Sequence, residues 1–409
     1  MTVKDHLHIL LVADGRSPTT LSWIRTLQAL EFTVSLVSTY PCKEPGDLDF
    51  FSVLPVAFGQ FASQTPSANP GQKQSFKTRL KKVINKRPGL FSAMRYCLGP
   101  ISVNIRKRQF VKLFDLVHPD LVHALRIPYE GMLASATPQG IPLVISTWGN
   151  DLTLHAGKTL SMTQLTRACL FRADGLMSDT RRDILLAKEW GFDKRKPSLH
   201  VPGSGGLDLD AINSTNAGSF DLQKIGLEPG QLLAINSRGY RPGSVHQDVF
   251  IKAVNLVRDK LPGLKFVCPG LAGGEASGWV EQCGIRDQVI ILPLLSQSEL
   301  WALNKQCILY ISPSSHDGTP NSLLEAMVCG CFPIAGDIPS MREWITPGEN
   351  GLLVDPQDPQ ALADAIMLAA SSPGFREQAA RFNRDLVITR ASRTATMPGI
   401  RKFYLNLLH

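Results

Sequence analysis

Two acidic residues eight positions apart, Asp317 and Glu325, are the first residues in this sequence whose spacing suggests chemistry. They lie in the stretch SSHDGTPNSLLEAMVCGCFPI, residues 314–334. This pattern predicts a loop after an apolar strand, then a helix with Pro320 in its first turn, and a stop at Gly330 before the next strand. The helical period places polar side chains, including that of Glu325, on one face and apolar side chains on the other.

The start of this predicted helix is suited to binding an anion. Its first backbone N–H groups have no partner within the helix, and the helix dipole adds a partial positive charge there, which favours a phosphate or diphosphate. One turn further in, Glu325 is placed to accept hydrogen bonds from a neutral diol such as a ribose. Asp317, just before the helix, can reach a sugar hydroxyl. The alternative is that Asp317 only caps the turn and Glu325 is an exposed carboxylate.

Short apolar strands alternate with helical patterns along most of the chain, which is typical of parallel sheets with crossover helices. One series runs from HILLVA to LHVPG, and a second begins at QLLAINS. Residues 202–218 between them are rich in Gly, Ser and Asn and suit a hinge. The sequence therefore predicts two doubly wound α/β domains, with ligands beyond the carboxyl ends of the strands and between the domains.

The run DGTPNSLLEAMVCGCFPIA resembles the donor-site motif of the retaining glycosyltransferases of family 4, in which two acidic residues are separated by seven others. Agreement continues through DIPSMREWITPGENGLLVDPQDPQALADAI, so that about 60 consecutive residues resemble the family. This resemblance implies the GT-B fold, which consists of two facing Rossmann-like domains. It implies an acceptor domain at 1–205, a nucleotide-sugar donor domain at 206–385, and a C-terminal helix at 386–409 that returns to the first domain.

The same resemblance implies roles for particular residues. Asp317 orients the donor sugar and Glu325 binds the ribose. Further donor contacts are expected from Gly318, Thr319, Pro320, Asn321, Ser322, Leu323 and Leu324. In the first domain, the resemblance points to Gly15, where the backbone would approach a ligand, to His123 as a catalytic residue, and to acceptor or sugar contacts from Trp148, Gly149, Asn150 and Asp151.

Two departures from the family pattern concern the donor site. Asp317 stands where the family has Glu, which shortens the side chain by one methylene. Arg238 matches an Arg that holds the diphosphate, but the Lys expected five or six residues later is replaced by Gly243 and Ser244. Arg241 is the nearest substitute cation, and we expect it to act with Arg238 in catalysis. His246, in the same loop, is interpreted as a surface or packed histidine.

By the same resemblance, we expect a metal-independent, retaining hexosyltransferase that moves a sugar from a UDP- or GDP-type donor to a hydroxyl acceptor. The acceptor would be a cell-surface polysaccharide, a glycolipid or a lipid-linked saccharide. No metal is expected because neither Asp-x-Asp sequence adjoins the motif, and no cofactor besides the donor is implied. Three alternatives stay open: an inverting transferase whose base is His123 or Asp151, a sugar-nucleotide epimerase or a phosphorylase, and a catalytically impaired nucleotide-sugar-binding component of a polysaccharide-synthesis complex.

Charge is concentrated in the first half of the chain. Residues 50–114 contain twelve Lys and Arg and no acidic residue. The segment 73–112 is therefore expected to meet an anionic membrane surface, although a solvated basic helix is the alternative. Nucleic acid is not expected, because aromatic residues are not interleaved with the basic ones. With no long apolar stretch and eight scattered cysteines interpreted as free thiols, the predicted location is the cytoplasm, with peripheral binding at the inner face of the cell membrane.

Overall fold

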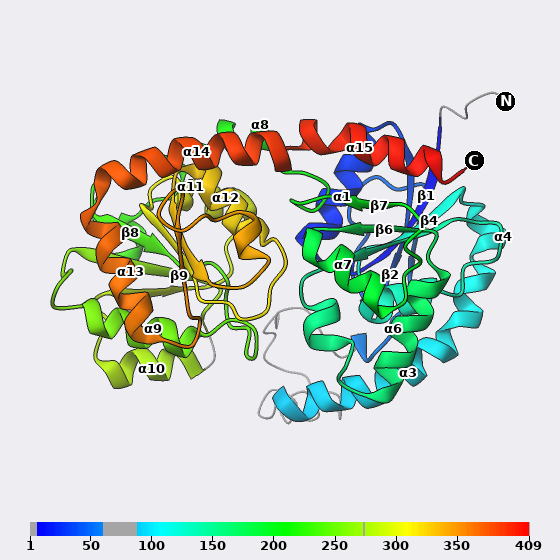
Figure 1. Cartoon of the computed structure of the whole chain (residues 1–409), viewed down its shortest axis with the longest axis horizontal. Helices are drawn as coiled ribbons and strands as arrows, with labels where there is room; N and C mark the ends of the chain where they lie inside the picture. Colours follow the sequence, from blue (N-terminus) through cyan, green and yellow to red (C-terminus); the bar gives the residue numbers. More distant parts are fainter. Residues whose placement is uncertain (1–5, 60–87, 273–274, 409) are drawn as a thin grey trace, which may run out of the picture. The chain divides into compact units, whose positions relative to one another are not determined.

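Two parallel β-sheets organise the computed structural model, which describes residues 6–59, 88–272 and 275–408 (Figure 1). The first sheet has the strand order β3-β2-β1-β4-β5-β6-β7, and the second has the order β10-β9-β8-β11-β12-β13. Neighbouring strands in both sheets run parallel, as in the registers of Leu10 with Ser35 and of Leu309 with Phe332. The predicted class of two Rossmann-like α/β domains is confirmed.

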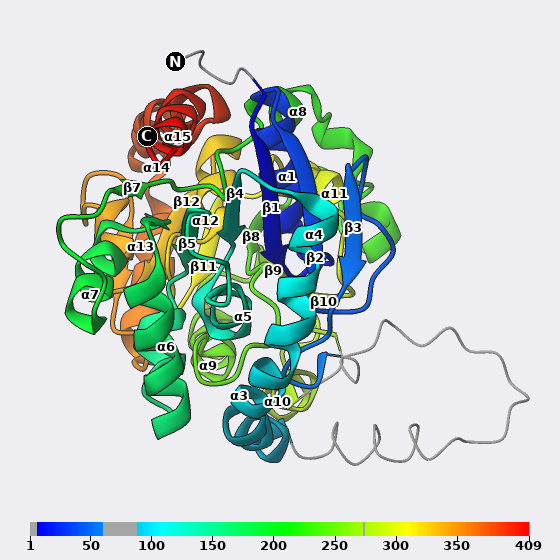
Figure 2. The same cartoon turned by 90° about the vertical axis from the view of Figure 1, so that its right-hand side faces the viewer.

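The five inner strands of the first sheet are almost fully buried, as expected for a parallel sheet covered by helices, and the strand at each edge is partly buried. Its strands are β1 (His8–Ala13), β2 (Thr33–Ser38), β3 (Phe50–Val53), β4 (Leu121–Ala124), β5 (Leu143–Thr147), β6 (Gly175–Ser178) and β7 (Ser198–His200). Figure 2 shows β1, β2 and β3 side by side. The accompanying helices are α1 (Pro18–Ala29), α3 (Pro88–Lys112), α4 (Phe114–Val117), α5 (Met132–Ala134), α6 (Leu160–Arg172) and α7 (Arg181–Trp190).

The second sheet has a different set of helices on each face. Its strands are β8 (Leu232–Ile235), β9 (Leu264–Pro269), β10 (Val289–Leu292), β11 (Leu309–Ser312), β12 (Phe332–Gly336) and β13 (Leu352–Val354). Along β8, Ala234 packs into one apolar cluster while Leu233 and Ile235 pack into the other, because successive side chains of a strand point to opposite faces. The first cluster includes α9 (Gln247–Val257), α10 (Glu275–Cys283) and α13 (Pro359–Ser371). The second includes α8 (Leu209–Ser214), α11 (Gln297–Asn304), α12 (Asn321–Cys329) and α14 (Pro373–Ala391).

Helix α12 has nearly the limits that the sequence predicts. Pro320 occupies its N-cap position with an extended backbone (φ −68°, ψ 126°), and the helix begins at Asn321. Gly330 ends it in the left-handed conformation (φ 97°), which glycine adopts at little cost. The helix therefore connects β11 to β12 with its N-terminus at the carboxyl end of β11.

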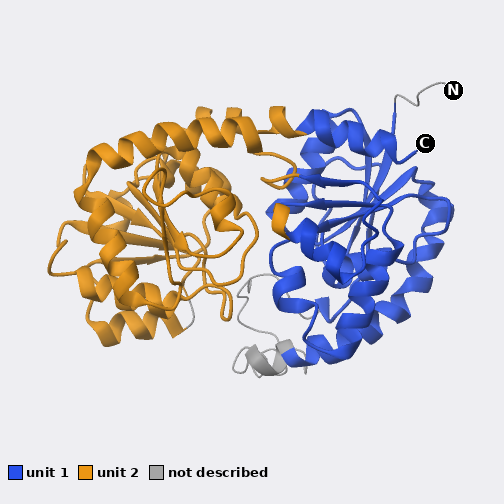
Figure 3. Ribbon diagram, viewed as in Figure 1, with its two compact units in different colours: residues 1–179, 183–200, 397–409 blue, residues 180–182, 201–396 orange. Residues whose placement is uncertain are grey.

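The chain divides into two compact units (Figure 3), one of residues 1–179, 183–200 and 397–409, and one of residues 180–182 and 201–396. The predicted boundaries were 205/206 and 385/386. The predicted boundary at 385/386 differs because residues 386–409 contain parts of two helices, the end of α14 and all of α15 (Arg393–Asn406). Helix α14 packs on α12, where Arg384 Nη1 donates to the Val328 carbonyl (3.2 Å). Only the second part of α15 joins the first unit.

Two further predictions can be compared directly with the described residues. All eight cysteines are free thiols, as predicted. No helix within the described ranges has both the length and the apolar character required to cross a membrane.

Candidate functional site

Two polar loops meet at the point where the strand order of the second sheet reverses. Strands β8 and β11 are neighbours, although three crossovers separate them in sequence. The loop after β8 carries Arg238, and the loop after β11 carries Asp317. In open α/β sheets this switch point is where ligands bind, because the two loops diverge and leave a crevice.

Arg238 and Asp317 form an ion pair across these loops. The Arg238 Nη2 contacts Asp317 Oδ2, and its Nη1 donates to Ser322 Oγ on α12 (3.3 Å). The two charged side chains are only 10% and 13% exposed. Burial alone would lower the pKa of Arg238, but the attraction of Asp317 outweighs it and the pKa is raised. The site therefore presents a permanent cation next to a carboxylate at the start of a helix.

The structure separates the predicted contacts of α12 into two groups. Asp317, Gly318, Asn321 and Ser322 lie at the helix start, and the Asp317 carboxylate accepts from the Gly318 N–H (3.1 Å). The next two predicted contacts, Leu323 and Leu324, have fully buried side chains, and their N–H groups donate to the Pro320 carbonyl (3.0 and 3.3 Å). The side chains of these two residues pack the helix onto the sheet, and a contact of either residue with the donor stays a prediction.

Thr319 and Pro320 pack under the first turn of α12, on its buried side. Both are buried, and Thr319 Oγ1 accepts a hydrogen bond from the Trp344 indole Nε1 (2.9 Å). The Asn321 side chain donates to Ser204 Oγ (2.8 Å). These contacts fix the first turn of α12, so its position relative to Arg238 is set by packing.

Glu325 is a buried carboxylate, and the alternative of an exposed one is wrong. The residue is 6% exposed, and its Oε1 accepts from the Gln297 Nε2 of α11 (3.1 Å). Burial raises its pKa to about 7, and the hydrogen bond from Gln297 opposes that shift. At neutral pH this carboxyl can therefore take up or release a proton as its surroundings change.

The loop after β8 is fixed to the loop after β11 by several hydrogen bonds. The Ser315 N–H donates to the Ser244 carbonyl (2.9 Å), and His246 Nε2 lies 2.9 Å from Ser315 Oγ. Gln247 donates to the Gly239 carbonyl (2.9 Å) and so holds the loop near Arg238. His246 is thus beside the donor motif, eight positions after Arg238, just beyond positions 243 and 244 where the missing Lys was sought.

Arg241, the predicted substitute cation, has an exposed side chain. Its carbonyl accepts from the N–H groups of Ser244 and Val245 (3.3 and 3.0 Å) and closes the turn that contains Gly243. Its role in binding phosphate stays a prediction, while the ion pair of Arg238 gives that residue a fixed position.

In the first unit, His123 is part of the core. It is fully buried, its Nε2 is 2.8 Å from Ser146 Oγ, and its Nδ1 is 2.8 Å from the Tyr404 hydroxyl. Burial lowers the pKa of His123 to about 3, so the ring is neutral. Both ring nitrogens of His123, predicted as a catalytic residue, thus have partners within the protein. The contact with Tyr404 connects α15 to β4.

Gly15 lies close to residues of β2 and of the segment that follows it, while its approach to a ligand stays a prediction. A Cβ at this position would lie 2.6 Å from Cys42 Sγ and 3.0 Å from Ser38 Oγ. The Gly15 N–H donates to the same Ser38 Oγ (3.0 Å). The close approach that requires glycine is therefore to the chain's own segment after β2.

Asp151 organises the loop that follows β5. It is fully buried, pairs with Arg126 Nη2 (2.8 Å), and accepts from the N–H groups of Ile127 and Trp148 (3.0 and 3.2 Å). Burial raises its pKa, although Arg126 opposes this. The guanidinium of Arg126 also lies over the Trp148 ring (5.6 Å). Of the predicted acceptor contacts, Trp148 and Asn150 are partly exposed, whereas Gly149 and Asp151 are buried.

Glu130, a further buried carboxylate, was not predicted from the sequence and lies near Arg126 of this loop region. Glu130 is 3% exposed, its Oε1 accepts from Thr39 Oγ1 (2.8 Å), and its Oε2 has no hydrogen-bond partner among the described residues. Burial raises its pKa to about 6, and Arg126 opposes that shift. Buried polar atoms without partners are rare and often mark functional sites. The sequence gives only a weak indication of this residue, which is that Glu130 is the single acidic residue between Asp120 and Asp151.

Residues 223–385 match the family model of glycosyl transferases group 1. The chain is 24% identical over 283 residues to a D-inositol 3-phosphate glycosyltransferase of Streptomyces scabiei, covering 64% of this chain and 61% of that protein. It is also 24% identical over 324 residues to the GDP-mannose:cellobiosyl-diphosphopolyprenol alpha-mannosyltransferase of Xanthomonas campestris, covering 78% and 76%. The chain thus spans about three fifths of the first relative and about three quarters of the second.

Solved structures show the same fold over nearly the whole chain. A sucrose-phosphate synthase from Thermosynechococcus elongatus superimposes with a TM-score of 0.71 at 14% identity, covering 98% of this chain and 99% of that one. Anabaena HepE, solved in complex with UDP, superimposes with a TM-score of 0.69 at 14% identity, covering 98% and 100%. At these identities the likeness establishes the fold, which is the two-domain GT-B arrangement of Rossmann-like sheets.

Proposed function

We propose that this chain, whose residues 223–385 match the family model of glycosyl transferases group 1, is a retaining glycosyltransferase. It transfers a sugar from a nucleoside-diphosphate sugar to a hydroxyl group of a saccharide or lipid-linked acceptor. The observation that carries the proposal is the Arg238–Asp317 pair at the N-terminus of α12, at the switch point of the second sheet. A cation and a carboxylate next to the N-terminus of a helix suit a diphosphate joined to a sugar.

Breaking the bond between the sugar and the diphosphate builds negative charge on the leaving phosphate. Arg238 and the N–H groups at the start of α12 are held in place before the reaction and can stabilise that charge as it forms. Asp317 accepts from a sugar hydroxyl and fixes the sugar's orientation. Glu325 binds the ribose hydroxyls. Because an arginine supplies the positive charge, we propose that the reaction needs no metal ion.

The anomeric configuration is retained if the acceptor hydroxyl attacks the sugar from the same side as the departing diphosphate. An oxygen of the departing phosphate then accepts the proton of that hydroxyl. In the first unit, the loop that contains Trp148 and Asp151, together with Arg126, is proposed to contact the acceptor or the donor sugar. An inverting enzyme would instead need its own base, and His123 is placed in the core with both nitrogens bonded. This favours retention over the alternative in which His123 acts as the base.

The similar proteins suggest which donors to test. One relative is named for GDP-mannose, and HepE has been solved with UDP-glucose. We expect either a UDP- or a GDP-sugar to raise the melting temperature, because a ligand at 100 times its Kd stabilises a protein by about 2.7 kcal/mol. The donor that stabilises is then incubated with saccharide and lipid-linked acceptors, and the product's anomeric configuration is read by NMR. Absence of stabilisation by every nucleotide sugar would contradict the donor site, and an inverted product would contradict retention.

A second proposed partner is an anionic membrane surface, which α3 would contact. The predicted basic segment 73–112 is described only from residue 88, so Lys73 to Arg87 lie outside the described residues. Within α3 one exposed stripe, spaced at helical intervals, joins apolar to basic side chains: Leu98, Ile101, Ile105, Arg108 and Lys112. The three apolar residues are 44%, 55% and 66% exposed. Apolar side chains next to cations suit a surface of anionic lipids.

We expect the wild type to sediment with vesicles that contain phosphatidylglycerol and to be released by salt. The double change Ile101→Ser and Ile105→Ser removes apolar area that the membrane would bury. It lowers the vesicle partition coefficient by about 30-fold or more, because each of these half-exposed side chains contributes about 1–2 kcal/mol on burial. Leu368→Ser is the matched control, since Leu368 is also exposed (51%) but lies on α13. Equal vesicle binding by the double variant and the control would contradict a contact between α3 and the membrane surface.

A further inference from the structure

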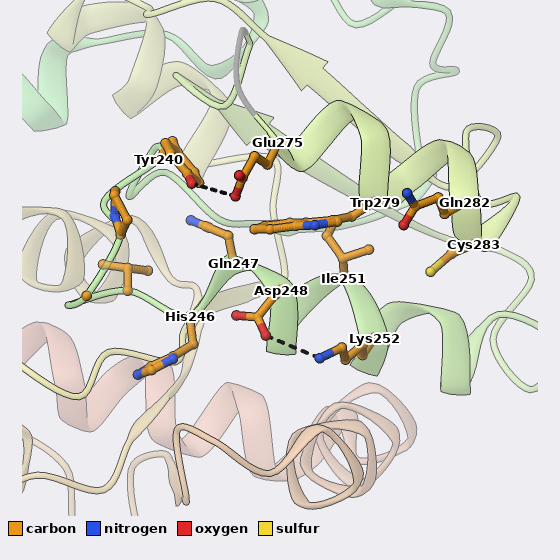
Figure 4. A pocket seen from close by; sticks show the side chains of 13 residues that line it. Tyr240, His246, Gln247, Asp248, Ile251, Lys252, Glu275, Trp279, Gln282 and Cys283 are labelled. Carbon is orange, nitrogen blue, oxygen red and sulfur yellow. Dashed lines mark hydrogen bonds and ion pairs between the residues drawn. The ribbon is translucent and has the colours of Figure 1, made fainter. Parts of the chain in front are cut away.

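A pocket of about 510 Å³ lies in the second unit between the loop after β8 and the helices α9 and α10 (Figure 4). These helices cover the face of the sheet opposite to α12, so the pocket is separate from Glu325 and from the start of α12. Its volume is within the range of small-molecule sites. The function proposed for Arg238 and Asp317 makes no use of it.

Two aromatic rings and two carboxylates line this pocket. The rings of Trp279 and Tyr240 have centroids 6.3 Å apart at an angle of 56°. Tyr240 donates its hydroxyl hydrogen to Glu275 (3.0 Å), and Lys252 donates to Asp248 (3.2 Å). Figure 4 shows the Trp279 indole between these two polar pairs. The pocket thus has an apolar platform with hydrogen-bonding groups on two sides.

The charges of the lining argue against a phosphate or a nucleotide as the occupant. Among the residues described as lining the pocket, Lys252 is the one lysine or arginine, and it is already paired with Asp248. Glu275 adds a further negative charge. The side chains of Asp248, Glu275 and Lys252 leave the lining with one carboxylate in excess, and this negative charge repels an anion.

A neutral polyol fits the lining better. The face of an indole ring is electron-rich and attracts the polarised C–H groups on one face of a sugar ring. Carboxylates accept hydrogen bonds from sugar hydroxyls, and the Gln282 amide can both donate and accept. We propose that this pocket is a saccharide-binding subsite, occupied by a neutral part of a carbohydrate chain away from the reacting sugar.

The position of the pocket connects it to the donor site. Tyr240 lies two residues after Arg238, and His246 both lines the pocket and contacts Ser315 of the donor loop. A saccharide held by Tyr240 and Trp279 would therefore contact the same loop that positions Arg238. The assignment of this saccharide as an acceptor or product chain rests on the proposed function, whereas binding of a saccharide in the pocket does not.

Binding is tested by saturation-transfer NMR and calorimetry with trisaccharides of glucose, mannose and galactose. We expect at least one trisaccharide to bind, with saturation transferred to ring protons on the face of the sugar that meets Trp279. Trp279→Ala and Glu275→Gln should each weaken this binding by about tenfold. The first removes the aromatic platform, and the second removes a charged carboxylate acceptor. Glu281→Gln is the matched control, because Glu281 is on the same helix but pairs with Arg286 outside the pocket.

Two further measurements separate this proposal from the donor site. Trp279→Ala and Glu275→Gln should bind the nucleotide sugar as the wild type does, and Arg238→Ala should bind the trisaccharide as the wild type does. If Trp279→Ala does not fold, Glu275→Gln and Tyr240→Phe carry the test. Absence of binding by all three trisaccharides, or unchanged binding in these variants, would overturn the subsite. Tighter binding of tetramethylammonium than of any saccharide would also overturn it and would identify a cation site.

Discussion

Replacing Arg238 with alanine lowers kcat for sugar transfer by about 100- to 1,000-fold, the effect of removing one preorganised donor from a developing anion. The guanidinium is 10% exposed and held between Asp317 and Ser322, so it does not have to reorganise when charge forms on the leaving phosphate. Rates of transfer and of donor hydrolysis, measured with the donor found by thermal shift, give the loss directly.

Two companion variants show whether the geometry or only the charge of Arg238 matters. Arg238→Lys keeps the charge but cannot hold two oxygens at once, so we expect an intermediate rate. Arg286→Ala, which removes an arginine that is 72% exposed and pairs with Glu281, should leave the rate unchanged. Because Arg238→Ala leaves the Asp317 carboxylate without its cation, a cooperative melting curve must accompany the rates. A folded Arg238→Ala with full activity would place the phosphate site elsewhere.

Glu325→Gln is expected to make the protein more stable at high pH while it weakens donor binding. Burial raises the Glu325 pKa from 4.5 to about 7, so the folded protein favours the protonated carboxyl. The stability that this group contributes is complete below pH 4.5 and is lost as pH rises through 7. By pH 8 the loss amounts to about 3 kcal/mol, since each pKa unit is worth about 1.4 kcal/mol. Glutamine does not titrate and avoids the loss.

The measurement is the melting temperature of the wild type and of Glu325→Gln from pH 5 to pH 8. The variant's advantage should be small at pH 5 and should grow toward pH 8, while Glu349→Gln, a change at an exposed residue, shows no such trend. A constant difference across this range would mean that the Glu325 carboxyl does not titrate there.

Glu325→Gln should lower donor affinity at high pH, although it raises stability there. An ionised carboxylate can accept from both ribose hydroxyls, and each charged hydrogen bond is worth about 1.5–3 kcal/mol. We therefore expect Glu325→Gln to bind the donor about 10- to 100-fold more weakly at pH 8. In the wild type, affinity should rise as pH passes through 7, because binding needs the ionised form. Equal affinity of variant and wild type would remove Glu325 from the ribose site.

The helix that follows Asp317 and carries Glu325 could be predicted from the sequence, whereas the donor site itself stays a prediction. The two acids of the motif, the limits of α12 and the match of Arg238 depend on patterns that span a few tens of residues. Local rules are sufficient for the limits of α12: proline before the first turn, glycine after the last, and an apolar face with the helical period. The same rules predicted two doubly wound sheets, because strands and helices alternate regularly along the chain. The match of Arg238 and the roles of the two acids rest on the resemblance to the family.

The surroundings of individual side chains were decided by contacts between distant parts of the chain. His123 is in the core because Tyr404, 281 residues later, completes its hydrogen bonds. Gly15 meets Cys42 of the segment after β2, and Glu325 is buried beside Gln297 of α11. None of these partners can be read from spacing in the sequence, because packing brings them together.

The sequence by itself determined which chemical groups this protein has and which of them follow a strand. The tertiary structure decided which of them are buried, paired or left without a partner: the ion pair of Arg238, the raised pKa of Glu325 and the partnerless oxygen of Glu130. The physical reason is that burial and electrostatic interaction depend on distances in space. Those distances are set by the folding of the whole domain, whereas a helix start or a strand is set by its own few residues.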